Sequence, residues 1–344
     1  MAEVSVANPR TAAAPAKTAS SAARDALVEL KTRIGKSVLG QDHLVESMLI
    51  GLLANGNVLI ESLPGLAKTR AVKTLAKQLA ADLSRVQFTP DLLPSDVTGA
   101  EIYTQTDKGG EFSFQKGPIF ANLLLADEIN RAPAKVQSAL LEAMEERQVT
   151  VAGKTYKLPD LFMVLATENP IEQEGTYPLP EAQLDRFLMH VVVTYPDEDT
   201  EGAIIKLNRE ETAHAGNGGK APPPAIPQQA IFDARREIDG VFVSDAAQQY
   251  MVDLIFATRF PARYKEPLSK WIQIGASPRG SLALDRCART RAWLDGQSFV
   301  TPDHVRAVLH DCLRHRLILT YEALADGVTA DQAIDEIARV VAPV

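Results

Sequence analysis

The chain is poor in the residues that build disulfide frameworks and metal clusters. It has two cysteines, Cys287 and Cys312, without a CxxC pair, and six histidines without an HExxH run. A disulfide scaffold or structural zinc site is therefore not expected, and the cysteine usage fits a reducing compartment. No apolar run approaches the ~20 residues of a transmembrane helix, and no signal-peptide core is present. These absences predict a cytoplasmic protein without a membrane span.

Positive charge is also scarce. The sequence has 36 Lys and Arg against 44 Asp and Glu, a formal net charge of −8. Proteins that bind nucleic acid generally carry a basic face, so we expect no nucleic-acid partner. A cluster of arginines makes the C-terminal third locally basic, and solvated helix faces are favoured there over a binding patch.

What the chain does contain is an ordinary globular composition, 46% hydrophobic and 23% charged. Its 344 residues exceed the roughly 250–300 of a single core, so two folded units are expected. Residues 1–23 are rich in Ala, Ser, Thr and Pro and are predicted to be a disordered tail. Residues 215–228, AGNGGKAPPPAIPQ, are predicted to be a linker.

Between these segments, residues 24–214 alternate strands with helices, and residues 229–344 form a helical unit. Short apolar strands are expected at 57–60, 85–88, 121–126, 161–166 and 190–193. Continuously apolar strands between helices indicate a parallel sheet covered on both faces. After the linker only helices are expected, three of them with N-caps at Ser244, Ser277 and Thr301. The predicted fold is α/β, an αβα parallel-sheet domain followed by a small all-helical lid.

A strand that runs into a glycine-containing loop and a Lys-Thr pair is the first sign of chemistry. Residues 57–69 read NVLIESLPGLAKT. In a P-loop, backbone N–H groups hold the phosphates, the lysine (Lys68) reaches the β- and γ-phosphates, and the hydroxyl (Thr69) binds magnesium. The strict G-x-x-x-x-G-K-[ST] pattern fails at Ser62 and Ala67, so a surface turn before a helix stays open for this segment alone.

Two acids end the next apolar strand, NLLLADE at 122–128. At the carboxyl end of a buried strand, Asp127 can hold magnesium through water and Glu128 can polarise the attacking water. The alternative is that both acids cap the following helix. A P-loop beside such a pair favours ATP hydrolysis.

Three further polar residues complete the candidate site. Asn169 follows the apolar strand FMVLAT and can contact the γ-phosphate or the water, or can simply be a turn residue. Arg186 and Arg279 can stabilise charge on the transferred phosphoryl group. The alternative for each arginine is an ordinary surface ion pair.

Six segments together resemble the MoxR family of AAA+ ATPases: GQ at 40–41, PGLAKT at 64–69, ADEINRAP at 126–133, ATENP at 166–170, LPEAQLDRF at 179–187 and GASPRG at 275–280. The resemblance covers about residues 25–344. It implies an αβα nucleotide domain, a helical lid and a ring, usually a hexamer. It also implies an insertion at about 92–117 and a β-hairpin at 148–158, where Ala152-Gly153 between alternating runs is itself a hairpin signal.

Carried over by motif, the resemblance implies roles for single residues. Asn169 matches sensor 1, Arg186 the arginine finger and Arg279 sensor 2, and whether Arg279 acts within its own subunit stays open. The implied catalytic group is Lys68, Glu128, Asn169, Arg186 and Arg279. The implied contacts to ATP are Gly40, Gln41, Ser62, Pro64, Gly65, Leu66, Ala67, Lys68, Thr69, Arg70, Asp127 and Arg279, with Thr69 and Asp127 at magnesium.

Ser62 departs from the family, which normally has glycine there, whereas Ala67 is usual. We expect the ordinary family backbone at this position. If that backbone needs a positive φ, serine costs roughly 1–2 kcal/mol.

The resemblance further implies a chaperone-like remodeller that helps to assemble or activate protein complexes, including metal-cofactor enzymes, with a von Willebrand factor A domain partner. A nucleic-acid translocase or helicase on the same core is the main alternative. A transcription-activator ATPase lacks its GAFTGA loop here, since residues 96–101 read DVTGAE. A nucleotide-gated binding module without hydrolysis has Ser62 as its sole support. The client complex is not encoded in any recognisable motif.

Overall fold

A five-stranded parallel sheet forms the centre of the α/β domain. The computed structural model describes residues 21–106, 109–171, 175–214, 223–264 and 267–343. The sheet order is β2-β5-β8-β1-β9, and each neighbouring pair is parallel. The strands are β1 (Val58–Ser62), β2 (Leu83–Gln87), β5 (Leu123–Asp127), β8 (Met163–Glu168) and β9 (Met189–Val193). All five predicted strands and the α/β fold class are confirmed.

Helices cover both faces of this sheet, as the apolar strands require. The core on one face includes residues of α1 (Ala22–Gly35), α2 (Asp42–Leu53) and α3 (Lys68–Gln78). The core on the other includes residues of α4 (Pro94–Thr98) and α5 (Ala134–Glu146). Short α6 (Glu181–Leu184) precedes β9, and α7 (Glu198–His214) follows it. Of the tail predicted at 1–23, residues 1–20 lie outside the described residues, and the prediction is wrong at its end because α1 begins at Ala22. Of the linker predicted at 215–228, residues 215–222 lie outside the described residues, and 223–228 contain no helix or strand.

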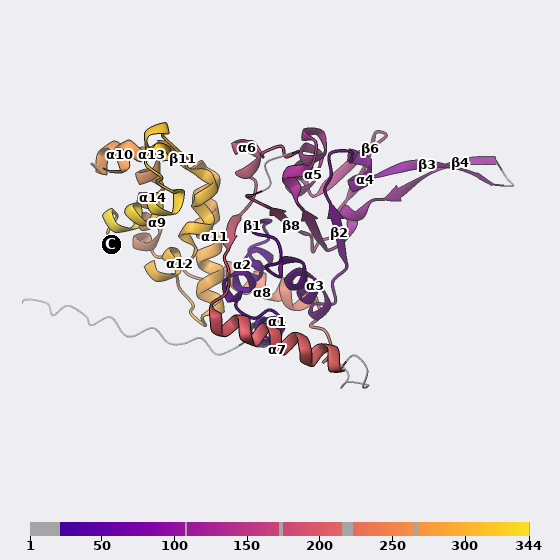
Figure 1. Cartoon of the computed structure of the whole chain (residues 1–344), viewed down its shortest axis with the longest axis horizontal. Helices are drawn as coiled ribbons and strands as arrows, with labels where there is room; N and C mark the ends of the chain where they lie inside the picture. Colours follow the sequence, from indigo (N-terminus) through magenta and orange to yellow (C-terminus); the bar gives the residue numbers. More distant parts are fainter. Residues whose placement is uncertain (1–20, 107–108, 172–174, 215–222, 265–266, 344) are drawn as a thin grey trace, which may run out of the picture.

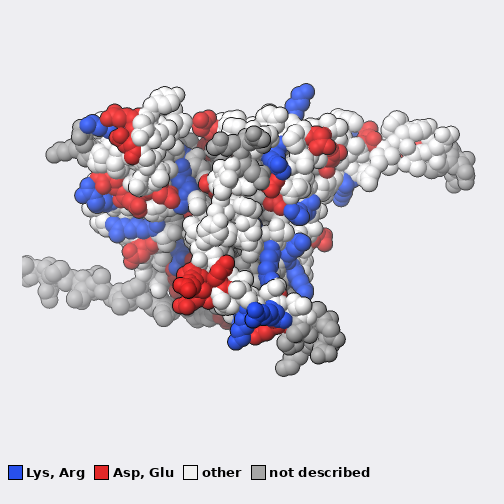
Figure 2. Space-filling model, viewed as in Figure 1, with Lys and Arg blue, Asp and Glu red and all other residues white. Residues whose placement is uncertain are grey.

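Two β-hairpins interrupt the alternation; one lies in the insertion implied at about 92–117, and the other is the hairpin implied at 148–158. β3 (Gly99–Thr106) and β4 (Gly109–Lys116) project from the body (Figure 1), and on the face in Figure 2 the described part is mostly uncharged. β6 (Gln148–Val151) and β7 (Lys154–Lys157) flank Ala152-Gly153, whose φ values are +49° and +77°. Positive φ at both positions is typical of a two-residue hairpin turn. The hairpins touch each other, since the Phe114 and Tyr156 rings stack with centroids 4.0 Å apart.

The lid contains α8 (Gln229–Asp239), α9 (Asp245–Arg259), α10 (Leu268–Trp271), α11 (Pro278–Leu294), α12 (Pro302–Leu313), α13 (Tyr321–Ala325) and α14 (Ala330–Val340). The side chains of Ser244, Ser277 and Thr301 accept N–H bonds at their helix starts, so the three predicted N-caps are confirmed. The expectation that strands end with β9 is wrong in one detail. β10 (Ile272–Ile274) pairs antiparallel with β11 (Ile318–Leu319), and strands this short show no periodicity in a sequence.

Short 3-10 turns join several elements: η1 (Pro118–Phe120), η2 (Ile129–Arg131), η3 (Pro261–Tyr264) and η4 (Arg314–Arg316). Within the described ranges, no helix is both long and apolar enough to cross a membrane.

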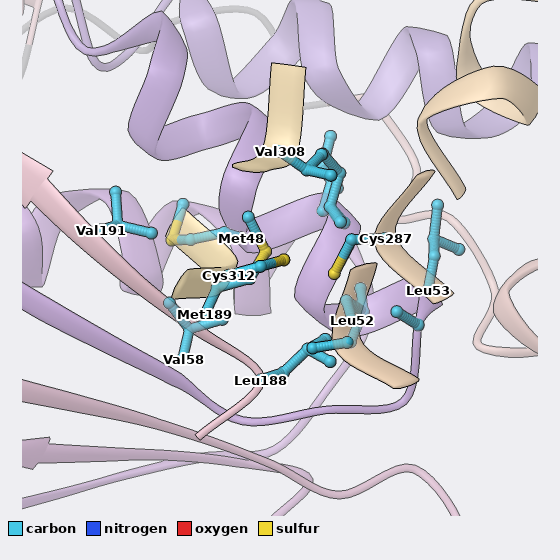
Figure 3. Packing of buried hydrophobic residues seen from close by; sticks show 14 of the residues in the cluster. Met48, Leu52, Leu53, Val58, Leu188, Met189, Val191, Cys287, Val308 and Cys312 are labelled. Carbon is cyan, nitrogen blue, oxygen red and sulfur yellow. The ribbon is translucent and has the colours of Figure 1, made fainter. Parts of the chain in front are cut away.

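One hydrophobic core runs across the junction between sheet domain and lid. Figure 3 shows Met48 of α2 and Met189 of β9 packed beside Cys287 of α11 and Cys312 of α12. Both cysteines are buried and reduced. Since continuous burial of apolar surface is the main stabilising term in folding, the lid is held firmly against its own sheet domain.

Candidate nucleotide site

The P-loop lies between the end of β1 and the start of α3. Gly65 and Ala67 both adopt left-handed backbone, with φ of +86° and +57°. Such turns direct successive backbone N–H groups toward one side, where the positive end of α3 adds to them. Nothing lies within 4 Å of the position a Gly65 Cβ would take, so this side of the loop is open. The loop and helix start therefore fit a phosphate chain.

Lys68 and Thr69 are the first two residues of α3. The Lys68 ammonium donates to the carbonyl oxygen of Ser62 at 3.2 Å, so the lysine lies across the loop that it would serve. Thr69 is half-buried beside it. Both side chains stand where a P-loop needs them.

The backbone at Ser62 differs from our expectation. Ser62 is the last residue of β1, is 2% exposed and pairs with Val193, and it is not among the residues with positive φ. Its hydroxyl donates to the Leu63 carbonyl oxygen at 3.0 Å. The strain account is therefore wrong at this position, because an extended strand accommodates any L-residue. Ala67 carries the left-handed backbone instead.

The two acids lie at the carboxyl end of β5, at the same edge of the sheet as the P-loop. Asp127 is buried, and its Oδ1 accepts from Thr167 Oγ1 at 2.7 Å while its Oδ2 lies 2.6 Å from an Arg85 Nη2. Glu128 has a left-handed backbone, φ +58°, and its Oε2 lies 3.0 Å from an Arg131 Nη1. Asp127 and Glu128 are thus brought together beside the loop, each held by an arginine.

Thr167 is a site residue that sequence reasoning missed. Its hydroxyl donates to Asp127 and also accepts the Glu128 backbone N–H at 2.9 Å, so it orients both acids. A signal existed, because parallel β5 and β8 pair Ala126 with Ala166 and so set Thr167 beside Asp127. Strand order, which the sequence does not state, was the missing step.

Asn169 lies at the same edge, just after β8, and is 5% exposed. Its Oδ1 accepts the backbone N–H of Ile171 at 3.2 Å, the contact of a turn residue. The turn alternative is therefore realised in this structure, and the sensor 1 role of Asn169 stays a prediction.

Two glutamates face each other across β1 and β8 near this edge. Glu61 and Glu168 are register partners, and Glu61 Oε2 lies 3.0 Å from His190 Nε2. The hydrogen bond from His190 lowers the pKa of Glu61 despite its burial. Burial raises the pKa of Glu168, and the Glu61 charge adds to that effect. Glu61 is therefore the more readily ionised of the two.

Two cavities bear on the candidate site. The smaller, of about 320 Å³, lies beside the P-loop, and the larger of the two, of about 380 Å³, is lined by Arg186 and Arg279. Most of the smaller cavity's wall is apolar, as a purine requires: Val38, Leu39, Leu66, Tyr195, Pro196, Ile204 and Leu207, with Gln41 and Asn208. Gln41 Nε2 donates to the Thr194 carbonyl at 3.1 Å. A Cβ on Gly40 would lie 2.5 Å from Thr200, so glycine lets α7 close this wall. Arg70 donates to the Ser37 carbonyl and pairs with Glu211 of α7.

Arg186 and Arg279 line the larger cavity, and both contact Glu145 of α5. An Arg186 Nη1 lies 3.4 Å from Glu145 Oε2, and Arg279 Nη2 pairs with Glu145 Oε1. Asp185 accepts from Ser277 Oγ at 2.8 Å and from Arg316 Nε at 2.8 Å, joining the lid to the same spot. The ion-pair alternative is thus realised for both arginines in the single subunit.

These arginines lie near the amino ends of the strands. The P-loop lies at the carboxyl ends, which form the opposite edge of the sheet. Parallel β9 and β1 pair Met189 with Val58 and Val193 with Ser62. Arg186 comes before β9, whereas the P-loop comes after β1, so about 16 Å of strand separates them at ~3.3 Å per residue. The structure therefore brings Lys68, Asp127, Glu128 and Asn169 to one edge, and places Arg186 and Arg279 together at the other.

Comparison with known proteins shows the family of the chain. The model for the ATPase family associated with various cellular activities (AAA) matches residues 57–189, and that for the AAA lid domain matches 269–337. Chaperone MoxR1 of Mycobacterium tuberculosis is 47% identical over 90% of this chain and 80% of its own length. Protein MoxR of Paracoccus denitrificans is 34% identical over 82% of this chain and 86% of its own. The chain belongs to the MoxR family of AAA+ ATPases.

A solved structure shows the same fold. A protein of Cytophaga hutchinsonii described as a candidate ATPase superposes on this MoxR-family chain with a TM-score of 0.85 at 44% identity, over 94% of this chain and 96% of that one. Membership of the family implies ATP binding, which the P-loop and the apolar cavity beside it fit.

Proposed function

We propose that this MoxR-family protein is an ATP-hydrolysing ring motor that acts as a chaperone-like remodeller of protein complexes. The observation that carries the proposal is the division of the candidate machinery between two opposite edges of one sheet. A single subunit has the phosphate loop and both acids at one edge, with the charge-stabilising arginines at the other. Such a division requires a neighbouring subunit to complete each site.

At the loop edge, which is the carboxyl end of the strands where the P-loop lies, each residue has a role in hydrolysis. Lys68 binds the β- and γ-phosphates, and Glu128 accepts the proton of the attacking water. Thr69 and Asp127 would hold magnesium, which would offset phosphate charge. Thr167 keeps Asp127 and Glu128 in register, and Asn169 orients the water. To do this, Glu128 rotates its side chain away from Arg131, with which it forms a half-buried pair.

At the arginine edge, Arg186 and Arg279 act on the nucleotide of the adjacent subunit. Neither can reach the loop of its own subunit along a sheet of this length. Guanidinium groups at a developing phosphoryl charge are among the strongest electrostatic contributions to phosphoryl transfer. The sensor 2 arginine therefore acts in trans, and a closed ring, which we take to be a hexamer, supplies every site.

The remodelling function rests on relatives. One is named a chaperone, and the family resemblance points to assembly or activation of complexes, including metal-cofactor enzymes. A cytoplasmic location and a von Willebrand factor A domain partner belong to the same proposal. Ser62 lies in unstrained extended backbone, so it gives no support to a module that binds nucleotide without hydrolysis.

Phosphate release from ATP tests the proposal. The parent should turn over ATP, and Glu128→Gln should lower the rate by about 10²–10⁴ while ATP binding persists. Light scattering should show ATP-dependent rings for both. Glu128→Gln turnover at the parent rate would remove Glu128 as the base, and turnover stimulated by DNA would favour the translocase alternative.

A further inference from the structure

We propose that Glu145 is a positioning residue that gathers Arg186 and Arg279 into one pair facing the nucleotide of the neighbouring subunit. The inference rests on the proposed trans role of these arginines. It adds a residue that neither the motifs nor the family resemblance singled out.

The geometry is a carboxylate bridge between two domains. Glu145 lies in the last turn of α5 in the sheet domain, and its side chain is 40% exposed. One carboxylate oxygen is contacted by Arg186, from the segment before β9, and the other by Arg279, from the first turn of lid helix α11. Because each arginine takes a different oxygen, Glu145 fixes their spacing as well as their direction.

Charge explains why the pair needs such a bridge. Two guanidinium groups repel each other at close range. Asp185, the other acid of the cavity wall, accepts from Arg316 and Ser277 and lies 4.0 Å from Arg279. Glu145 is therefore the carboxylate that touches both arginines in the described cavity wall, and without it the two would be driven apart.

The bridge is compatible with phosphate binding. A guanidinium has five N–H donors in a planar fork, and the contacts to Glu145 use Nη1 of Arg186 and Nη2 of Arg279. The side chains of Arg186 and Arg279 are 32% and 43% exposed, so the fork remains accessible from outside. Glu145 thus anchors one side of each fork while the opposite side meets the phosphoryl group.

Mixed rings test this without disturbing the nucleotide site that is read out. Parent subunits are diluted into excess Glu128→Gln subunits, which bind ATP but serve mainly as arginine donors. The comparison uses donors that also carry Glu145→Gln. Turnover per parent subunit should fall about three- to tenfold, since partly exposed ion pairs contribute modestly each. The KM for ATP should stay within about twofold, because the parent's own loop is intact.

Controls separate positioning from general damage. Glu146→Gln removes the same charge from the next, exposed position of α5 and should leave parent turnover unchanged. Glu145→Asp keeps the charge and should retain more activity than Glu145→Gln. All donors should unfold within about 2 °C of each other and form rings of equal mass.

The outcomes distinguish the two proposals. If Glu145→Gln donors support full turnover, or if Glu145→Asp is as slow as Glu145→Gln with a raised KM, the positioning role is wrong. If Arg186→Ala and Arg279→Ala donors also support full turnover, the trans arginines themselves are wrong. A parent without ATP turnover would defeat the proposed function before either.

Discussion

The two edges of the sheet are built in different ways. The loop edge comes from residues at or shortly after the carboxyl ends of β1, β5 and β8, so the pairing of the parallel strands brings them together. The arginine edge needs α5, the segment before β9 and the lid to converge, and only the docked lid brings Arg279 to Glu145. Nucleotide binding should therefore tolerate disturbance of the lid, whereas hydrolysis should not.

The largest expected effect is on ATP binding, which should depend on the loop edge and not on the arginine edge. Lys68→Ala removes the charge contact to the β- and γ-phosphates and should abolish ATP binding. Calorimetry on the folded variant measures this, and Lys77→Ala, an exposed residue in the last turn of the same helix, is the matched control. Unchanged ATP affinity in Lys68→Ala would show that the loop edge does not bind ATP through Lys68.

The arginine edge should fail differently. Arg186→Ala should keep ATP affinity and lower turnover by about 10³–10⁵, as for other arginines supplied in trans. Mixing Arg186→Ala with Glu128→Gln subunits should restore part of the rate, because one kind of mixed interface has both intact parts. Arg236→Ala, an exposed lid arginine, should change neither quantity. Demonstrably mixed rings without rescue would leave Arg186 as a structural residue.

Much of this division could be predicted from the sequence, but not all of it. The loop-edge residues follow continuously apolar strands, whose local pattern carries over directly into the sheet. The convergence of Glu145 with Arg186 and Arg279 depends on helix packing across two domains, and no local pattern encodes it. Arg85 and Thr167 were missed because their contact with Asp127 depends on strand order. Ser62 was misjudged because the loop begins one residue later than the family motif suggests.

The dependence on the docked lid can be tested at the domain junction. Asp311 of α12 is 2% exposed; its Oδ1 pairs with Arg314 at 2.6 Å and its Oδ2 lies 3.0 Å from His43 Nε2 of α2. Burial opposes its ionisation, but the hydrogen bond from His43 and the charges of His43 and Arg314 outweigh this and lower its pKa. A lowered carboxyl pKa stabilises the fold above the ordinary value near 4, and this stabilisation is lost as pH falls through the lowered pKa.

Asp311→Asn leaves Arg314 with one fewer acid and should lower the free energy of unfolding at pH 7 by about 3 kcal/mol. Asp335→Asn, an exposed lid pair with His310, should cost less than about 0.5 kcal/mol. Urea unfolding measures both. If the comparison of the edges holds, folded Asp311→Asn loses turnover but keeps ATP affinity, and an equal loss of both would contradict it.

The smallest effects distinguish two positions within the loop edge itself. Ala67 has φ +57°, a conformation that costs an L-residue roughly 1–2 kcal/mol and a glycine very little. Glycine also has more conformational freedom to lose on folding, which offsets part of this gain. The net effect of Ala67→Gly should be to raise the free energy of unfolding by about 0.5–1 kcal/mol. Ser62 lies in extended backbone at the end of β1 and donates a hydrogen bond, so Ser62→Gly should lower it by a similar amount. Urea unfolding of the two variants beside the parent gives both signs, and ATP affinities at one magnesium concentration show whether the relieved strain lies in the nucleotide-bound loop. If Ser62→Gly raised the free energy of unfolding and Ala67→Gly lowered it, the left-handed backbone would lie at Ser62, at the start of the loop, and not at Ala67.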